Sequence, residues 1–336
     1  MEQASKPMYT KKQLLLPVIF VSALFWGLWA TRPTETLTKY HGETMGTTWS
    51  VSVYGSAPIA LQKGIQDELN KVNNLMSSYH PDSEVSKFNR HELSPHPISK
   101  YTHAVIEKSL EIHEASGGVF DITVSPLVTA WGFGFPPVER LPTEEEITET
   151  QEYVGSDKLI LRKDSLQKTD SRLQINLSAI AKGYAVDLVA EYLQEQEQEN
   201  FLIEVGGEIR SQGKKSNQRW RVGIEKPQKG RSGILEVVYL SDYAMATSGD
   251  YRNYKKKEGI HYSHTIDPRT GRPITHTLAS ITVLAPTCME ADAWATALNV
   301  LGTKEALSLA EEHELPIYML EKQESGEFEI ITNTLF

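Results

Sequence analysis

Cysteine is almost absent from this chain of 336 residues, and positive charge is the minority charge. The single cysteine, Cys288, has no partner for an internal disulfide and cannot form a metal site from several thiolates. Its place far from the N-terminus also excludes the lipid-bearing cysteine of a processed lipoprotein. Lys and Arg number 34 against 44 Asp and Glu, so the net charge of −10 has the wrong sign for a protein that covers a long stretch of nucleic acid. No nucleic-acid partner is expected.

The familiar nucleotide-binding fingerprints are missing as well. The chain contains neither the P-loop pattern nor a GxGxxG sequence after a strand, so any nucleotide site here has another design. From Leu37 onward there is no low-complexity tract, internal repeat or long Pro/Gly linker. At about 300 residues, this part of the chain is long enough to bury one large core or two closely packed lobes.

One long apolar run is present, and it lies near the N-terminus. Leu14 to Ala30 contains no charge, and as a helix it covers about 26 Å, just enough to cross a bilayer. Several lysines precede the run, while Trp26 and Trp29 lie near its far end. This asymmetry predicts a cytoplasmic N-terminus, an exported remainder and tryptophans at the outer interface.

A cleaved signal peptide is the alternative for this run. Leu28-Trp29-Ala30 is a poor match to the small-x-small pattern of a cleavage site, which favours a retained anchor. We therefore predict four parts along the chain: a cytoplasmic N-terminus at 1–13, a transmembrane anchor at 14–30, a linker at 31–37 and one exported domain at 38–336.

Apolar periodicity predicts a mixed α+β body for the exported domain. Helices are expected where apolar residues recur every three or four positions, at 59–75, 104–115, 180–194, 290–300 and 304–313. Strands are expected at 48–54, 201–205, 220–224, 235–240 and 280–284. Because helices and strands do not alternate strictly, the pattern favours antiparallel sheets with packed helices over a doubly wound parallel sheet.

The densest polar string of the chain runs from His264 to Pro273. It joins an imidazole, a carboxylate and a guanidinium, and its proline and glycine can fix the loop so that the polar groups point at a substrate. His264 is our candidate general base, because histidine titrates in the range that this task requires. Arg269 could stabilise developing charge, or it could only lock the loop by pairing with Asp267.

Other clusters could also bring polar or aromatic groups to a ligand, although each fits an ordinary turn, helix end or bulge equally well: 42–47, 76–80, 116–121 and 204–208. A further cluster, 176–184, places Lys182 in the first turn of a predicted helix. Backbone amides and an ammonium can meet phosphate oxygens there, whereas a solvated surface lysine is the alternative.

Asp292 and Thr296 form a candidate site for a hard cation. They lie four positions apart on a predicted helix and hence on one face of it. A carboxylate, a hydroxyl and one backbone carbonyl leave room for water and for ligand phosphates, which is the usual arrangement around Mg²⁺. Taken alone, the pair would be interpreted as two ordinary polar helix residues.

Taken in order, these clusters resemble the ApbE family, the FAD:protein FMN transferases. The resemblance rests on six segments, Met45–Thr47, Ser116–Asp121, Ala179–Asp187, Gly206–Gly207, His264–Pro273 and Asp292–Thr296. It runs from about His41 to about Gly302, and the string from His264 is its most specific part. The resemblance implies an α+β fold related to the T-fold and a domain on the periplasmic side of a bacterial inner membrane.

The resemblance also implies FAD as the substrate and Mg²⁺ as the essential ion. Matching positions imply FAD contacts at Met45, Tyr79, Val119, Phe120, Asp121, Asn176, Lys182 and Ile266. They imply Mg²⁺ ligands at the Ala179 carbonyl, Asp292 and Thr296, which makes Asp292 a catalytic residue beside His264. The family commonly has Asp at position 176 and Ala at position 119, and the first of these differences leaves the hydrogen bond of Asn176 open.

The reaction implied by the resemblance moves FMN from FAD onto a Thr or Ser hydroxyl of a target protein as a phosphoester and releases AMP. Acceptors of this kind are subunits of membrane redox complexes of the Nqr or Rnf type. Two rival interpretations share the same residues. One is an FAD pyrophosphatase, in which water replaces the protein hydroxyl, and the other is an anchored flavin-binding protein without catalysis.

Overall fold

The computed structural model describes residues 36–336 apart from 135–139, 228–232, 250–253 and 258–259. The predicted anchor at 14–30, the segment 1–13 before it and all but the last two residues of the linker at 31–37 lie outside the described residues. Within the described ranges, no helix combines the length and the apolar character that a bilayer crossing requires.

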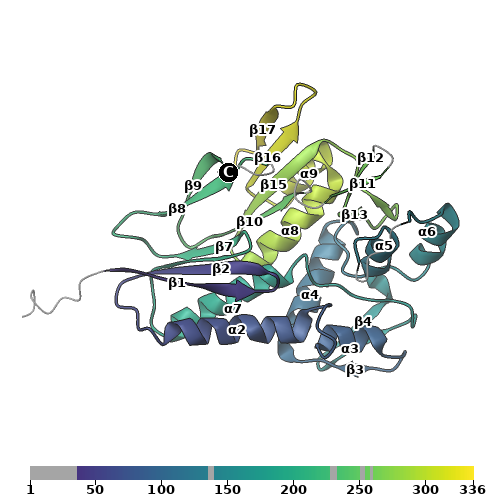
Figure 1. The fold of residues 1–336 in the computed structure, drawn as a ribbon, viewed down its shortest axis with the longest axis horizontal. Coiled ribbons are helices and arrows are strands. Elements are labelled where there is room, and N and C mark those ends of the chain that lie inside the picture. Colours follow the sequence, from purple (N-terminus) through teal and green to yellow (C-terminus); the bar gives the residue numbers. More distant parts are fainter. Residues whose placement is uncertain (1–35, 135–139, 228–232, 250–253, 258–259) are drawn as a thin grey trace, which may run out of the picture.

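One eight-stranded sheet forms the centre of the molecule, with strand order β1-β2-β6-β7-β10-β15-β16-β17 (Figure 1). Every neighbouring pair in it is antiparallel. Its strands are β1 (Leu37–Thr44), β2 (Thr47–Tyr54), β6 (Phe201–Val205), β7 (Glu208–Gln212), β10 (Ala244–Gly249), β15 (Leu278–Ala285), β16 (Ile317–Lys322) and β17 (Phe328–Thr332).

Helices cover one face of this sheet. The helices are α2 (Leu61–Met76), α4 (Lys100–Ala115), α7 (Ala181–Glu195), α8 (Cys288–Leu301) and α9 (Thr303–Glu312). Helix α7 lies against α2 and α8, and the buried apolar faces of all three form one continuous core with the sheet. A hairpin of β8 (Trp220–Glu225) and β9 (Ile234–Leu240) packs on the opposite face.

Side-chain alternation along β10 explains this two-sided burial. Ala244 and Ala246 join the core beneath the helices, whereas Met245 between them packs with Val222 and Leu240 of the hairpin. Successive residues of a strand point to opposite faces, so a strand covered on both sides is apolar without interruption. The small alanines let α8 approach the sheet closely.

Short elements complete the end of the molecule that carries α5 and α6 (Figure 1). They are α3 (Glu84–Arg90), β3 (His96–Pro97), α5 (Ser125–Ala130), α6 (Glu144–Gln151), η1 (Ser156–Lys158), β4 (Leu159–Arg162), β5 (Ser165–Lys168), β11 (Tyr254–Lys257), β12 (Ile260–Ser263), β13 (Ile266–Asp267) and β14 (Arg272–Pro273). The start of β1 lies at the opposite end of the molecule (Figure 1).

The structure confirms the α+β class, and it corrects the expected loop at 42–47. Gly42 lies within β1 opposite Trp49, and a Cβ on Gly42 would come within 2.7 Å of the Trp49 indole nitrogen. The turn itself is only Met45 and Gly46, with φ angles of 47° and 72°, as a two-residue hairpin turn requires. Position 42 therefore requires glycine because the Trp49 indole packs over it.

Candidate active site

A cavity of about 940 Å³ opens where the ends of several elements meet, a size typical of small-molecule sites. Eleven of the sequence-predicted site residues line it: Tyr79, Val119, Phe120, Asp121, Asn176, Ala179, Lys182, His264, Ile266, Asp292 and Thr296. Met45 is not in this lining and packs instead against the main core at the β1–β2 turn. The structure thus brings together residues from distant parts of the sequence, while their roles toward a ligand remain predictions.

The close contact between α7 and α8 positions Asp292. Gly183, in the first turn of α7, donates its amide hydrogen to Asp292 Oδ2 over 2.9 Å. A Cβ at position 183 would lie 2.3 Å from the Cys288 carbonyl oxygen, so only glycine allows the two helices to approach this closely. Asp292 is consequently held with Oδ2 bound to the backbone, while Oδ1 has only a longer ion pair with Lys182, at 3.6 Å.

Asp187, one turn further along α7, holds the N-terminus of α8. Its carboxylate accepts hydrogen bonds from the amides of Cys288 and Met289 at 2.9 and 2.8 Å, and it pairs with Arg210 at 2.5 Å. The first amides of a helix have no partner within the helix, and a carboxylate also favours its positive end. Burial raises the pKa of Asp187, while Arg210 and the two amides oppose that rise.

Lys182 lies between two carboxylates at the base of the cavity. Its Nζ is 2.6 Å from Glu208 Oε1 and 3.6 Å from Asp292 Oδ1. Burial raises the pKa of Glu208 to about 7, although the Lys182 ammonium acts in the opposite direction. The pKa of Lys182 is raised because its two acidic neighbours, Asp292 and Glu208, outweigh the effect of its own burial. The arrangement excludes the alternative of Lys182 as a freely solvated surface lysine.

The donor set around Asp292 fits a magnesium ion. Asp292 and Thr296 line the same cavity from one face of α8, and Ala179 reaches it from the loop before α7. A carboxylate, a hydroxyl and a carbonyl are all oxygen donors, which Mg²⁺ prefers together with water and phosphate oxygens. Across the described residues, no group of three or more His, Cys, Asp and Glu side chains could hold a metal. Oxygen donors such as these three suit Mg²⁺, whereas sites for transition metals commonly include nitrogen or sulfur donors.

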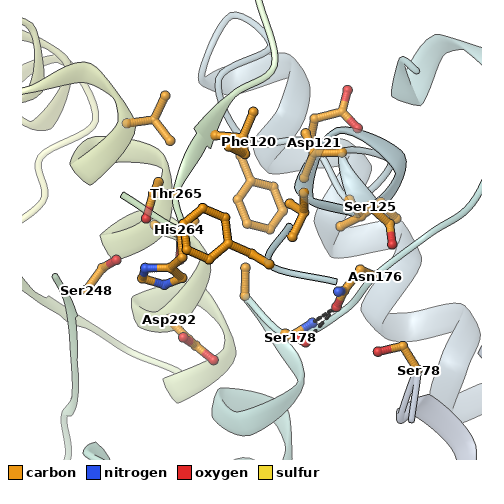
Figure 2. A pocket seen from close by; sticks show the side chains of 18 of the residues that line it. Ser78, Phe120, Asp121, Ser125, Asn176, Ser178, Ser248, His264, Thr265 and Asp292 are labelled. Carbon is orange, nitrogen blue, oxygen red and sulfur yellow. Dashed lines mark hydrogen bonds between the residues drawn. The ribbon is translucent and has the colours of Figure 1, made fainter. Parts of the chain in front are cut away.

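Asp121 fixes the loop that presents Phe120. Its carboxylate accepts hydrogen bonds from the backbone and hydroxyl of Thr123 and from both the amide and hydroxyl of Ser156. His113 contacts the same segment, with Nδ1 2.8 Å from the Phe120 carbonyl oxygen. Figure 2 shows the Phe120 ring directed into the cavity, while the Asp121 carboxylate lies further from its centre. Asp121 thus has an internal structural role in addition to lining the cavity.

Asn176 braces the loop that carries Ala179. Its Oδ1 accepts hydrogen bonds from the amide and the hydroxyl of Ser178, at 2.9 and 2.6 Å (Figure 2). An aspartate at this position offers the same acceptor oxygen. The asparagine therefore preserves the brace and changes only the second terminal atom of the side chain, from an acceptor to a donor.

His264 lies at the head of a loop that is held by contacts outside the cavity. Figure 2 shows its imidazole and the Asp292 carboxylate on the same side of the cavity, and Phe133 packs edge-on to the imidazole at 6.4 Å. Arg269 binds the Asp267 carboxylate through Nε and Nη2, at 3.0 and 2.8 Å. Neither Asp267 nor Arg269 lines the cavity, so the structure favours the interpretation of Arg269 as a loop lock.

The turn of this loop is fixed from a neighbouring helix. Trp131 donates its indole hydrogen to the Gly271 carbonyl over 2.8 Å, and Gly271 has a φ of 68°. Gln151 donates to the Arg269 carbonyl at 3.3 Å, and a Cβ on Gly271 would come within 3.0 Å of the Gln151 side chain. The glycine is required both by the backbone conformation and by this close packing.

Sequence reasoning missed Glu208 as a member of the site. The segment 204–208 is a candidate cluster in the sequence, with an ordinary bend or bulge as the alternative, but Glu208 has no role in that prediction. In the structure, Gly206 and Gly207 form the turn between β6 and β7, with φ angles of 61° and 106°. That turn brings Glu208 to the first position of β7, directly beside Lys182. A carboxylate that follows a glycine pair was the signal that could have indicated it.

Comparisons with known proteins identify the family of the chain. The model of the ApbE family matches residues 45–319. An FAD:protein FMN transferase of Vibrio cholerae is 42% identical over 294 residues, which cover 85% of this chain and 87% of the relative. The corresponding enzyme of Escherichia coli K12 is 38% identical over 304 residues, covering 87% of this chain and 86% of the relative.

Solved structures give the same result. The flavin transferase ApbE of Vibrio cholerae superposes with a TM-score of 0.82 at 39% identity, covering 90% of this chain and 98% of that one. The apo flavinyl transferase ApbE of Pseudomonas stutzeri gives 0.83 at 33% identity, covering 90% and 96%. The chain therefore belongs to the ApbE family and transfers FMN from FAD to protein.

Proposed function

We propose that this chain transfers FMN from FAD onto a threonine or serine hydroxyl of a target protein in a Mg²⁺-dependent reaction that releases AMP. The observation that carries the proposal is the convergence of Ala179, Lys182, His264, Asp292 and Thr296 on one cavity. This convergence supports neighbouring places for a nucleotide pyrophosphate, a cation and a base.

Charge neutralisation is the first requirement of this reaction, because an anionic pyrophosphate resists attack by an oxygen nucleophile. Asp292, Thr296 and the Ala179 carbonyl would hold Mg²⁺, which when bound neutralises phosphate charge and steadies the departing phosphate. Lys182 would bind phosphate oxygens from the first turn of α7, where the helix N-terminus also favours anions. Phe120 would lie against a planar ring of the substrate.

Proton removal from the acceptor hydroxyl is the second requirement. The acceptor oxygen forms a bond to the phosphorus of the FMN moiety, the bond from that phosphorus to the bridging oxygen breaks, and AMP leaves with that oxygen. His264 would take the hydroxyl proton, since a neutral imidazole is a suitable base near neutral pH. The lock between Asp267 and Arg269 would keep the loop, and hence the imidazole, in place.

The cellular setting is part of the same proposal. We infer that residues 14–30 anchor the chain in a bacterial inner membrane, with the catalytic domain facing the periplasm, because lysines precede the apolar run. We infer subunits of Nqr-type or Rnf-type redox complexes as acceptors, on the basis of the family resemblance. The relation of the fold to the T-fold has the same basis.

Mass spectrometry of a target protein tests the proposal directly. The protein is incubated with FAD, Mg²⁺ and the extramembrane part of a candidate acceptor, and the acceptor is then digested. A gain of one FMN on a peptide that contains Thr or Ser, with one AMP released per FMN, supports transfer. Free FMN and AMP with an unmodified acceptor would instead support the pyrophosphatase, and no AMP release at all would support a flavin-binding protein.

A further inference from the structure

The ammonium of Lys182 has two carboxylates within reach, and the structure distinguishes them. Nζ lies 2.6 Å from Glu208 Oε1, a direct charge-assisted hydrogen bond, but 3.6 Å from Asp292 Oδ1, beyond hydrogen-bond distance. Both carboxylates are almost fully buried, with side-chain exposures of 5% and 7%. Glu208 is therefore the hydrogen-bonded partner of Lys182, whereas Asp292 Oδ1 has only a longer ion pair with the ammonium and receives no hydrogen bond from it.

The availability of Asp292 Oδ1 matters because its other oxygen is already engaged. Asp292 Oδ2 accepts the hydrogen bond from the Gly183 amide, so Oδ1 is the atom that remains for a metal ion. A lysine ammonium that moved about 1 Å closer would form a direct ion pair with this oxygen and would compete with a divalent cation for it. Whatever holds Lys182 at its present distance protects the metal ligand.

Glu208 is placed to do this. It is the first residue of β7, immediately after the Gly206–Gly207 turn. Glu204 Oε1 accepts a hydrogen bond from the Gly207 amide at 2.9 Å, and this contact stabilises the turn. Oε1 of Glu208 binds Lys182, and its Oε2 is buried with no hydrogen-bond partner among the residues that the structure describes. A rigid turn and a buried position leave this carboxylate with Lys182 as its one partner in the described structure.

We propose that Glu208 is a positioning residue that holds Lys182 away from Asp292 and so keeps Asp292 Oδ1 free to bind Mg²⁺. The inference rests on the proposed metal site at Asp292. In this role Glu208 lines the cavity but is not itself a ligand of the metal. Its effect passes through Lys182, which remains free to direct its other hydrogens at phosphate oxygens.

A double-mutant cycle on metal affinity tests this proposal. Binding of Mn²⁺, as a probe for Mg²⁺, is measured by electron paramagnetic resonance of the free ion at pH 8 with saturating FAD, in the wild type, Glu208→Gln, Lys182→Met and the double variant. We expect Glu208→Gln to weaken Mn²⁺ binding about tenfold or more, the size typical for lost support of a metal ligand. The double variant should bind Mn²⁺ with an affinity within about threefold of that of the Lys182→Met single variant, because without the ammonium the loss of Glu208 has nothing left to release.

The cycle distinguishes a role of Glu208 in positioning Lys182 from a direct effect of the Glu208 charge on the metal ion. If Glu208 acted only through its own negative charge, the two substitutions would change affinity independently, and this additive result would overturn the proposal. Glu204→Gln removes the same charge from the same hairpin but keeps an amide oxygen that can accept the Gly207 hydrogen bond, so it should leave Mn²⁺ affinity within about threefold of wild type. Glu208→Asp, which shortens the reach to Lys182, should weaken binding as well, and it provides a second test should Glu208→Gln fold poorly.

Asp292→Asn distinguishes failure of this inference from failure of the proposed metal site. If Asp292→Asn binds Mn²⁺ as the wild type does, the metal site itself is wrong. If Asp292→Asn loses Mn²⁺ binding and the cycle is additive, only the role of Glu208 is wrong.

Discussion

Gly183 of α7 lies directly against the Cys288 carbonyl of α8, so that a Cβ at position 183 would stand 2.3 Å from that oxygen. The same glycine donates its amide hydrogen to Asp292 Oδ2. One residue without a side chain thus sets the distance between two helices and the orientation of the candidate metal ligand.

Gly183→Ala is expected to destabilise the protein, because the added methyl group forces α7 and α8 apart. We expect a loss of about 1–3 kcal/mol in the free energy of unfolding, together with weaker Mn²⁺ binding as Asp292 shifts. Urea unfolding and a metal titration measure the two effects. Gly233→Ala is the matched control, since a Cβ at Gly233 meets nothing within 4 Å. Wild-type stability of Gly183→Ala would contradict the packing argument.

Asp292→Asn should abolish transfer while the protein stays folded. The amide oxygen of asparagine can still accept the Gly183 hydrogen bond, so only the charge that attracts the cation is lost. FAD binding should survive in weakened form, because Phe120, Tyr79 and Asn176 contact other parts of the cavity. Transfer is followed by FMN incorporation and binding by flavin fluorescence. Full transfer at ordinary Mg²⁺ concentrations would remove Asp292 from the metal site.

His264→Ala should lower the transfer rate by roughly two to four orders of magnitude while barely changing FAD affinity. A base contributes to the chemical step and not to ground-state binding. The wild-type rate should also fall at low pH, since imidazolium cannot accept a proton, and this acid limb should be absent from the variant. Equal losses of affinity and rate with an unchanged pH profile would mean that His264 only braces its loop.

Glu208→Gln should flatten the pH dependence of stability. Burial raises the pKa of Glu208 from 4.5 to about 7, so the folded protein holds this proton more tightly than the unfolded chain does. The stabilisation that this bound proton provides is complete below the unfolded-state pKa of 4.5, and it is lost as pH rises through the folded-state pKa of about 7. Between about pH 5 and pH 8, the wild type should therefore lose about 1–3 kcal/mol more unfolding free energy than the variant. Urea titrations at a series of pH values measure this difference. If the unfolding free energies of wild type and variant changed in parallel with pH, the raised pKa of Glu208 would be wrong.

Deletion of residues 1–31 should give a soluble and active enzyme. The residues that line the cavity lie between Ser78 and Val300, and β1 begins only at Leu37, so the deletion removes no described core residue. Gel filtration and the transfer assay check solubility and activity. A folded but inactive truncation would show that the N-terminal segment does more than tether the domain.

The long helices and the common face of Asp292 and Thr296 could be predicted from the sequence because they obey a simple period. Most apolar residues of the helix expected at 59–75 form the buried face of α2, although Ile59 lies before the helix and is exposed, and Asp292 and Thr296 reach one cavity from α8 as their spacing indicates. The helix expected at 104–115 ends at Ala115 in α4, and Gly117 and Gly118 follow it with φ angles of 64° and 85°. Local sequence carries such information because helices are stabilised along one face.

Strand β1 and the pairing of Glu208 could not be predicted in the same way. Strand β1 lies at the edge of the sheet and mixes Lys39, His41 and Gly42 with few buried residues, so it lacks a clear apolar alternation. Glu208 meets Lys182 only after the β6–β7 turn and α7 have packed together, 26 residues apart in sequence. Contacts of this kind depend on tertiary structure and leave no periodic signal.

The length and direction of α2 determine how far the cavity lies from the start of β1. The start of β1 is bound beside Gly55, near the beginning of α2, whereas α2 ends at Met76, just before Tyr79 at the cavity. A helix of 16 residues spans roughly 24 Å, so attachment point and cavity lie at opposite ends of that length. If residues 14–30 anchor the chain in a bilayer, as we propose, the cavity would lie about one helix length from the point where the anchored segment joins the domain, and it would suit acceptor hydroxyls at that separation from the anchor.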